Sequence, residues 1–184
     1  MAIYSEINER QESVVDVAKK MLIAARTAPK GKGADNLEMA ILTENDIRLL
    51  AMEMRKIGEQ KEYDIFIRDA DNILASADAM VLIGSRIKTL GLKVCSLCGF
   101  AGCATKVKYP LVPCVYNIGD LGIAVGSAVA VAADSRVDNR IMHTAGIAAL
   151  NLEIFSSSVK IIWGIPLSAS SKIPFLTVRN KNIL

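Results

Sequence analysis

"LGIAVGSAVAVAA", from Leu121 to Ala133, is the longest apolar stretch of the 184-residue chain, and Asp120 and Asp134 flank it. A helix that crosses a bilayer needs about 20 apolar residues, so we expect this shorter stretch to be a buried helix. Glycine and alanine recur in it and allow another backbone to approach closely. Because the stretch is more apolar than one side of a small monomer needs, we expect a homodimer. The small residues are Gly122, Gly126, Ala128, Ala130 and Ala132.

The composition around this stretch is that of one globular domain, residues 1–184, since domains commonly hold about 100–200 residues. Hydrophobic residues make up 52% of the chain and aromatic residues only 5%, which favours aliphatic packing and subunit contacts. With 22 Lys and Arg against 19 Asp and Glu, the net charge is +3. This charge is too small, and too scattered, to indicate a nucleic-acid partner.

The first twenty residues, "MAIYSEINERQESVVDVAKK", are charged throughout and lack the apolar core of a secretory signal. We therefore expect a cytoplasmic protein without a membrane partner. Thiols stay reduced in the cytoplasm, where clustered cysteines are more often metal ligands than disulfides.

Apolar periodicity predicts mixed α and β structure. Helices are expected over 6–26, 43–58, 119–133 and 140–152, and strands over 36–43 and 78–84. "YDIFIRD" (63–69) is interpreted as a strand or extended piece, followed by a short helix. A last strand, "SVKIIWGIPLS" (158–168), is expected to stop at Gly164–Pro166.

All four cysteines lie in one segment, residues 94–114, with the spacing C-x2-C-x4-C-x10-C: Cys95, Cys98, Cys103 and Cys114. Such short spacings let thiolates from a tight loop converge, and Gly99 and Gly102 permit the backbone to wrap around a centre. Pro110 and Pro113 stiffen the return to Cys114, which we expect to be the fourth ligand.

Three interpretations of the thiols remain open: an iron–sulfur cluster, tetrahedral zinc, or thiols that bind no metal. Cysteine zinc sites more often present two C-x2-C pairs, and only one is present here. The spacing therefore favours the cluster.

The segment "CSLCGFAGC" (95–103) resembles that of [4Fe-4S] domains, which usually end with a more distant cysteine. Together with "AARTAPKGKGADNLE", "DLGIAVGSAVAVAADSRVDNRIM" and "WGIPLS", it resembles a family of uncharacterised prokaryotic proteins described as containing a ferredoxin domain. That family is similar to the FMN-dependent nitroreductases. The resemblance implies an α+β fold: a three-layer sandwich with a central, mostly antiparallel sheet, assembled as a homodimer, with an inserted cysteine-rich loop.

The same resemblance implies a set of flavin contacts. The stretch from Ala28 to Asn36 matches the nitroreductase segment that contacts FMN, and "WGIPLSASSKIPFLTVRN" matches the C-terminal segment whose arginine binds the phosphate. Arg140, in the polar corner after the apolar helix, is a further candidate, although a solvated ion-paired corner is the simpler interpretation. The candidates are Arg26, Pro29, Lys30, Lys32, Asn36, Arg140, Lys172 and Arg179.

Two departures leave the flavin open. Nitroreductases begin with an R-R-S-x-R phosphate clamp, whereas this chain has only "NER" near Arg10, and Leu37-Glu38-Met39 replaces their Q-P-W. The hypothesis is a redox protein with an iron–sulfur cluster and a possible FMN. The alternative is a non-enzymatic protein with structural zinc or a redox-sensing cysteine site. No catalytic residue is assigned: a lone His143 on a helix and the lack of a G-x-S-x-G motif argue against a hydrolytic triad.

Overall fold

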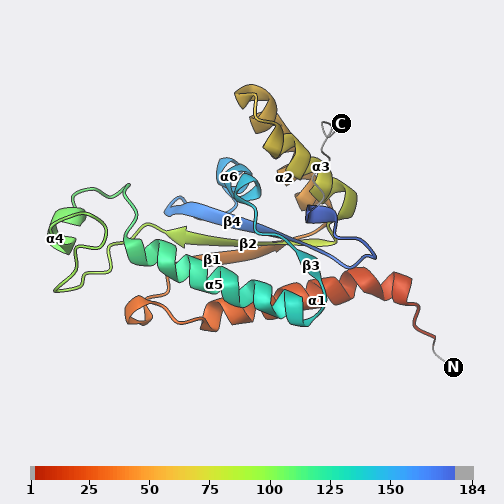
Figure 1. Cartoon of the computed structure of the whole chain (residues 1–184), viewed down its shortest axis with the longest axis horizontal. Coiled ribbons are helices and arrows are strands. Elements are labelled where there is room, and N and C mark those ends of the chain that lie inside the picture. The colour runs from red at the N-terminus through yellow and green to blue at the C-terminus, as the bar shows by residue number, and fades with distance from the viewer. Residues whose placement is uncertain (1–2, 177–184) are drawn as a thin grey trace, which may run out of the picture.

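A computed structural model describes residues 3–176 of the chain, and the order of its helices and strands is shown in Figure 1. The elements are α1 (Glu6–Thr27), η1 (Gly31–Gly33), β1 (Leu37–Leu42), α2 (Glu44–Lys61), α3 (Asp64–Ser76), β2 (Ala79–Arg86), α4 (Cys103–Lys106), α5 (Val115–Asp134), β3 (Asp138–Asn139), α6 (His143–Asn151), β4 (Val159–Ser168) and η2 (Pro174–Leu176).

The strands form one sheet in the order β1-β2-β4-β3, and every pairing is antiparallel. Strand β2 lies inside the sheet, where Leu82 pairs with Ala40 of β1 and with Gly164 of β4. Burial of β2 from Ala79 to Ser85 shows that both of its faces are covered.

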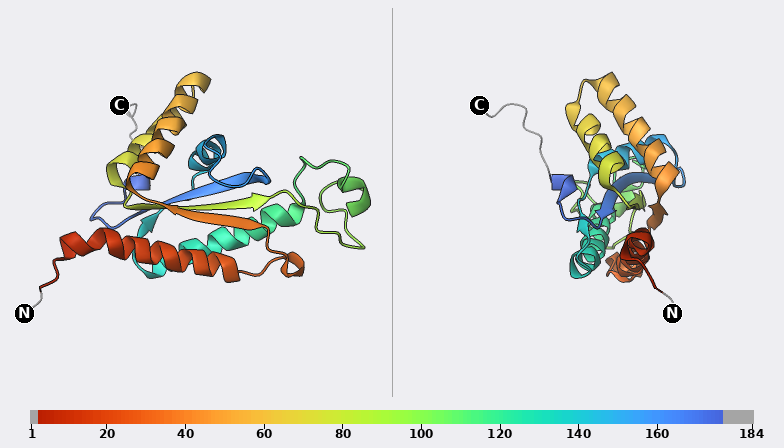
Figure 2. Two further views of the ribbon diagram at one scale, coloured as in Figure 1. Left: turned by 180° about the vertical axis from the view of Figure 1, so that it is seen from behind. Right: turned by 90° about the vertical axis from the view of Figure 1, so that its right-hand side faces the viewer.

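Helices cover the two faces of the sheet as separate layers (Figure 2). The even-numbered residues of β2, Met80 and Leu82, pack with α2, α3 and α6, while Val81 and Ile83 pack with α1 and α5. This division follows from the period of two in a strand, which sends successive side chains to opposite faces. The α+β sandwich with a central antiparallel sheet is thereby confirmed.

Helix α6 lies unusually close to β4. A Cβ added at Gly146 would stand 1.8 Å from the carbonyl oxygen of Ile162, and one added at Gly164 would stand 2.6 Å from the Cβ of Ala145. Only glycine at these two positions lets the helix backbone rest on the strand.

The structure bears out the first helix, the second helix and the strands β1 and β2. The extended piece expected at residues 63–69 was wrong, because Asp64–Ser76 is one continuous helix. Its buried residues Phe66, Ala70 and Ile73 recur at helical spacing, whereas Ile65 and Ile67 produced a misleading alternation.

Strand β4 does not stop at Gly164–Pro166 but continues to Ser168. Proline has no backbone N–H to donate, so a strand tolerates it only where a neighbouring strand does not need that donor. Pro166 pairs with Met80 of β2 on one side of β4. On the other side it lies between the β3 pairing at Leu167 and the bridge from Met142 to Gly164.

Helix α5 begins at Val115, four residues before the predicted start, so that Asp120 lies inside it. Within residues 3–176 it is the one helix long and apolar enough to cross a membrane. One such helix is weak evidence for a span, since core helices pass the same test. Leu121, Ala124 and Ala128 are fully buried against α1 and the sheet. Helix α5 is therefore the buried helix that the sequence predicts.

Gly146→Ala tests the close approach of α6 to β4. The added methyl group meets backbone rather than a movable side chain, so the helix must shift, and we expect a loss of about 1–3 kcal/mol in the free energy of unfolding. Chemical denaturation measures this loss. Ile147→Ala, at an exposed position of the same helix, should change stability by no more than about 0.5 kcal/mol. Equal stability of the two variants would contradict the packing described.

Candidate functional site

Residues 87–114, called here the cysteine loop, connect β2 to α5 and extend beyond the end of the sheet (Figure 1). The loop contains one short helix, α4, which packs substantially against no other described helix or strand. All four cysteines are free thiols; Cys114 is buried, and the other three are half-buried. The loop is thus a separate unit that carries all the thiols of the chain.

The four thiols share the loop without meeting at one point. Among residues 3–176, no three His, Cys, Asp or Glu side chains are gathered so that they could hold a metal ion. The donor chemistry nevertheless fits a thiolate-bound centre, because four free sulfur ligands are the set that iron–sulfur clusters and structural zinc use. Gly91 and Gly99, with φ of 73° and 82°, give the loop turns that other residues rarely adopt.

The base of the cysteine loop is held by Asn117, a buried residue of α5. Its side-chain oxygen accepts the N–H of Lys88, at 3.0 Å, and the N–H of Cys114, at 3.3 Å. One amide therefore connects the beginning of the loop to its end.

Cys114 is the N-cap of α5 and forms a capping box with Asn117, whose backbone N–H also donates to the Cys114 carbonyl oxygen at 2.9 Å. This position directs a helix N-terminus at the sulfur. The helix dipole there complements the negative charge that a thiolate carries as a metal ligand.

A cavity of about 400 Å³ lies between the cysteine loop, α5 and the turn that follows α1. Leu97 of the cysteine loop lines the cavity. Asp120 also lines it, and the carboxylate of Asp120 accepts the N–H of Gly31 at 3.0 Å. Side chains of Leu90 and Tyr116 stand within 2.9 Å of the Cβ that any other residue would add at Gly31. The full lining is Pro29, Lys30, Gly31, Leu97, Val115, Tyr116, Gly119, Asp120 and Ile123.

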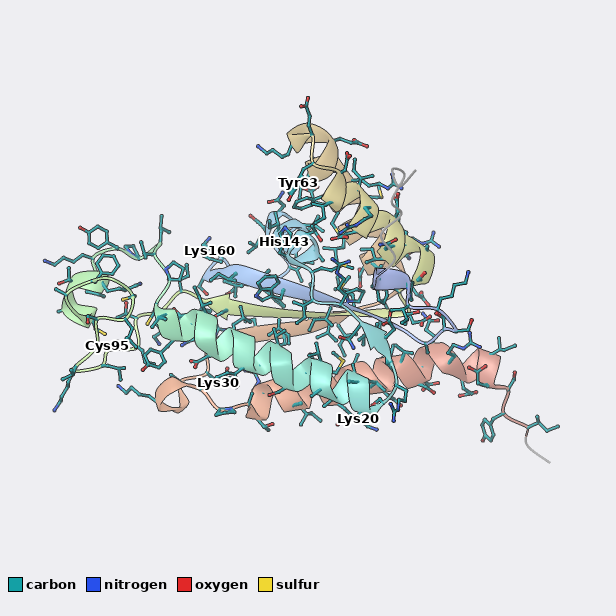
Figure 3. The ribbon with its side chains drawn as sticks, viewed as in Figure 1. Lys20, Lys30, Tyr63, Cys95, His143 and Lys160 are labelled. Atoms are coloured by element: carbon teal, nitrogen blue, oxygen red, sulfur yellow. The ribbon has the colours of Figure 1, made fainter. Side chains whose placement is uncertain are left out.

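The predicted cavity residue Lys30 acts as a helix cap in this structure. Its ammonium donates to the carbonyl oxygens of Ala25, Arg26 and Ala28 at 3.1, 2.7 and 2.9 Å. These three bonds use all the donors of the ammonium. Figure 3 shows Lys30 below α5, at the same end of the molecule as Cys95.

Arg26 is also engaged within the turn, where it pairs with Asp35 and reaches the carbonyl oxygen of Leu37. Partial burial opposes ionisation of Asp35, but hydrogen bonds from Arg26 and from the Leu37 N–H hold the pKa of its carboxyl below the ordinary value. The pair fixes the end of α1 to the start of β1. Lys32, at φ 55°, is exposed at the tip of this turn.

The remaining flavin candidates lie in separate parts of the structure. The carbonyl of Asn36 accepts the N–H of Arg86 beside β2, whereas Arg140 follows β3 and donates to the carbonyl oxygen of Phe175 at 2.7 Å. Lys172 is exposed in the segment between β4 and η2. Figure 1 shows η2 towards the other end of the sheet from the cysteine loop. Arg179 lies outside the described residues. Asn36, Arg140 and Lys172 of one chain do not line the cavity.

Comparison with known proteins accounts for this architecture. Residues 112–176 match the family described as "Uncharacterized protein containing a ferredoxin domain (DUF2148)". An uncharacterised protein of Archaeoglobus fulgidus is 36% identical over 181 residues, which cover 94% of this chain and 96% of the relative. The chain belongs to this ferredoxin-domain family.

Solved structures relate the fold of this ferredoxin-domain protein to nitroreductases. A nitroreductase with bound FMN from Desulfitobacterium hafniense has a TM-score of 0.56 at 13% identity, with 92% of this chain and 86% of that one covered. The Lactococcus lactis nitroreductase CinD, in complex with nicotinic acid, has a TM-score of 0.60 at 14% identity, with coverage of 92% and 81%. The nitroreductase-like fold is confirmed.

Two polar residues of this site escaped sequence reasoning: Asn117 and Asp120. Asp120 was interpreted as the end of an apolar segment, although it lies one turn inside α5. Asn117 precedes the predicted start of that helix and therefore had no assigned face. An earlier helix start, signalled by Pro113 just before the N-cap, would have brought both residues into view.

Replacement of Asn117 by leucine tests how the cysteine loop is held. The variant removes the shared acceptor and leaves the N–H of buried Cys114 without a partner, at a cost of about 1–3 kcal/mol. We expect faster proteolysis within residues 87–114, by about tenfold or more, while the sandwich stays folded. Asn117→Asp keeps an acceptor oxygen and should protect the loop. If Asn117→Leu is cleaved as slowly as the parent protein, Asn117 does not hold the base of the loop.

Proposed function

We propose that this protein is a cytoplasmic redox protein whose cysteine loop binds an iron–sulfur cluster next to a cavity for a small molecule or a flavin. The observation that carries the proposal is that Leu97 of the cysteine loop and Gly31 of the turn after α1 line the same cavity. A centre in the loop would therefore stand beside whatever the cavity binds. Free thiols throughout the loop agree with a reducing compartment.

The proposed ligands are Cys95, Cys98, Cys103 and Cys114, and the cluster is a [4Fe-4S] type. Such a cluster supplies one-electron transfer when bound. The chain supplies the sulfur ligands, a buried helix N-cap at Cys114 and a loop base closed by Asn117. These contributions set the position and surroundings of the centre.

FMN is the proposed occupant of the cavity. Its volume of about 400 Å³ lies within the usual range of ligand pockets, and the lining is mostly apolar, as a flavin ring requires. Tyr116 and Pro29 offer flat surfaces for the ring, and Lys32 is the exposed cation nearest in sequence to the lining. Arg140 and Lys172 would have to come from a second subunit.

The second candidate function is a structural zinc site or a redox-sensing set of cysteines. It is favoured by the loop itself, which has one short helix and few contacts, so a metal that only fixes the loop would already stabilise it. Zinc without any chromophore in anaerobically purified protein would support this candidate.

Cys114→Ser separates the ligand role of this thiol from its capping role. Serine is a favoured N-cap, so α5 and the fold should remain intact, while a cluster would be lost or kept only as a labile three-iron form. The measurements are the absorption spectrum and the iron, sulfide and zinc contents after anaerobic purification. Ser96→Ala, in the same loop, is the matched control. Undiminished iron in Cys114→Ser would mean that the fourth ligand is another group.

We also propose that the protein is a homodimer that uses the exposed face of α5. Gly119, Gly122 and Gly126 have nothing within 4 Å of an added Cβ, and Ile118 and Ile123 are about half exposed beside them. An apolar, glycine-lined helix face on the surface suits another copy of the same helix.

Gly126→Leu tests this assembly. On an isolated monomer the change should stabilise α5 by about 0.5–1 kcal/mol, because glycine is a poor helix former and the site is open. Within a close helix contact the leucine instead clashes, so we expect sedimentation to show dissociation into folded monomers. Gly126→Ala should dissociate less. A parent protein that is monomeric at micromolar concentration would contradict the dimer.

A further inference from the structure

Lys106 is among the largest fully buried side chains of the described residues, with 1% of its surface exposed. Lysine is almost never buried to this extent unless its charge is paired. Yet within residues 3–176 the ammonium of Lys106 takes part in no ion pair, and the hydrogen bonds of Lys106 are made by its main-chain N–H and carbonyl oxygen. A buried cation of this kind needs an anion beside it.

Lys106 belongs to the cysteine loop, at the end of α4, where its N–H donates to the carbonyl oxygen of Gly102 at 3.0 Å. Cys103 is three residues earlier in the same helical turn. Side chains three apart on a helix lie on one face, so Lys106 and Cys103 are neighbours on α4.

The side chain of Lys106 is directed into the loop rather than outward. Its neighbours in sequence, Val107 and Lys108, are exposed, and so are Thr105 and Tyr109. Because α4 packs substantially against no other described helix or strand, the chain that buries Lys106 is mainly the cysteine loop itself. Lys106 is therefore buried within the same loop that carries the thiols.

We propose that Lys106 is the internal counter-charge of the thiolate-bound centre, an inference that rests on the proposed function. Four thiolates carry more negative charge than the metal core neutralises, so the loaded centre is a net anion in a poorly solvated place. A fixed ammonium beside it lowers the cost of that charge. It also favours the reduced, more negative state, which raises the reduction potential.

Lys106→Met removes the charge and keeps an unbranched side chain of similar length. Lys108→Met, an exposed lysine two residues further along the same loop, is the matched control. Both variants are purified anaerobically beside the parent protein, and iron, sulfide and zinc are measured first.

In the loaded protein, Lys106→Met should shift the ratio of oxidised to reduced centre at a fixed potential by about tenfold towards oxidised, which is about 59 mV for a one-electron couple. It should also release its metal to a chelator about tenfold faster. If zinc rather than iron is bound, the release rate is the readout. Lys108→Met should change neither quantity by more than about twofold.

In the metal-free protein, Lys106→Met should stabilise the cysteine loop instead of weakening it. There the ammonium is a buried charge without a partner, and its replacement by methionine should make residues 87–114 more resistant to proteolysis. A lysine that serves only to pack the loop would instead weaken both forms when replaced.

The outcomes separate the two proposals. Opposite effects on the loaded and metal-free forms support the role of Lys106. A parent protein that binds metal, with Lys106→Met unchanged in potential and in metal release, overturns that role and leaves the proposed function standing. A parent protein that binds neither iron nor zinc overturns both.

Discussion

The side-chain oxygen of Asn117 accepts two backbone N–H groups, one from Lys88 and one from Cys114, and so joins the two ends of the cysteine loop. The entropy cost of closing a loop grows only slowly with its length, so one buried acceptor suffices to define the base of a long insertion. The sandwich has both faces of its sheet covered. The short helix of the cysteine loop makes no substantial contact with any other described helix or strand.

Helix α5 links the core, the cysteine loop and the cavity. Leu121 and Ala128 anchor it in the core with α1, Cys114 begins it, and Tyr116 and Asp120 face the cavity. Its remaining face presents glycines to the surface. A change in the loop at Cys114 would therefore reach the cavity wall within about one helical turn, because both belong to one stiff element.

Periodicity in the sequence was sufficient for the long elements whose apolar faces are distinct, such as α1, α2 and the buried strand β2. It failed at residues 63–69, where Ile65 and Ile67 imitate a strand inside a helix, and at Pro166, whose effect depends on which neighbouring strand lies opposite. The cysteine spacing located the candidate site. The roles of Asn117 and Lys106 could not follow from sequence, since both depend on which backbone or charge comes near once the loop is closed.

The charges around the site also constrain how a flavin would lie. Asp120 is 7% exposed and lines the cavity, so its inner wall presents a carboxylate oxygen, which attracts hydrogen-bond donors and repels phosphate. Lys30 does not offset it there, because its ammonium is bound to the end of α1. The phosphate of an FMN would therefore belong at the outer turn near Lys32, with the ring and its N–H group towards Asp120. That orientation turns the redox-active part of the ligand towards α5, which carries the last cysteine at its first turn.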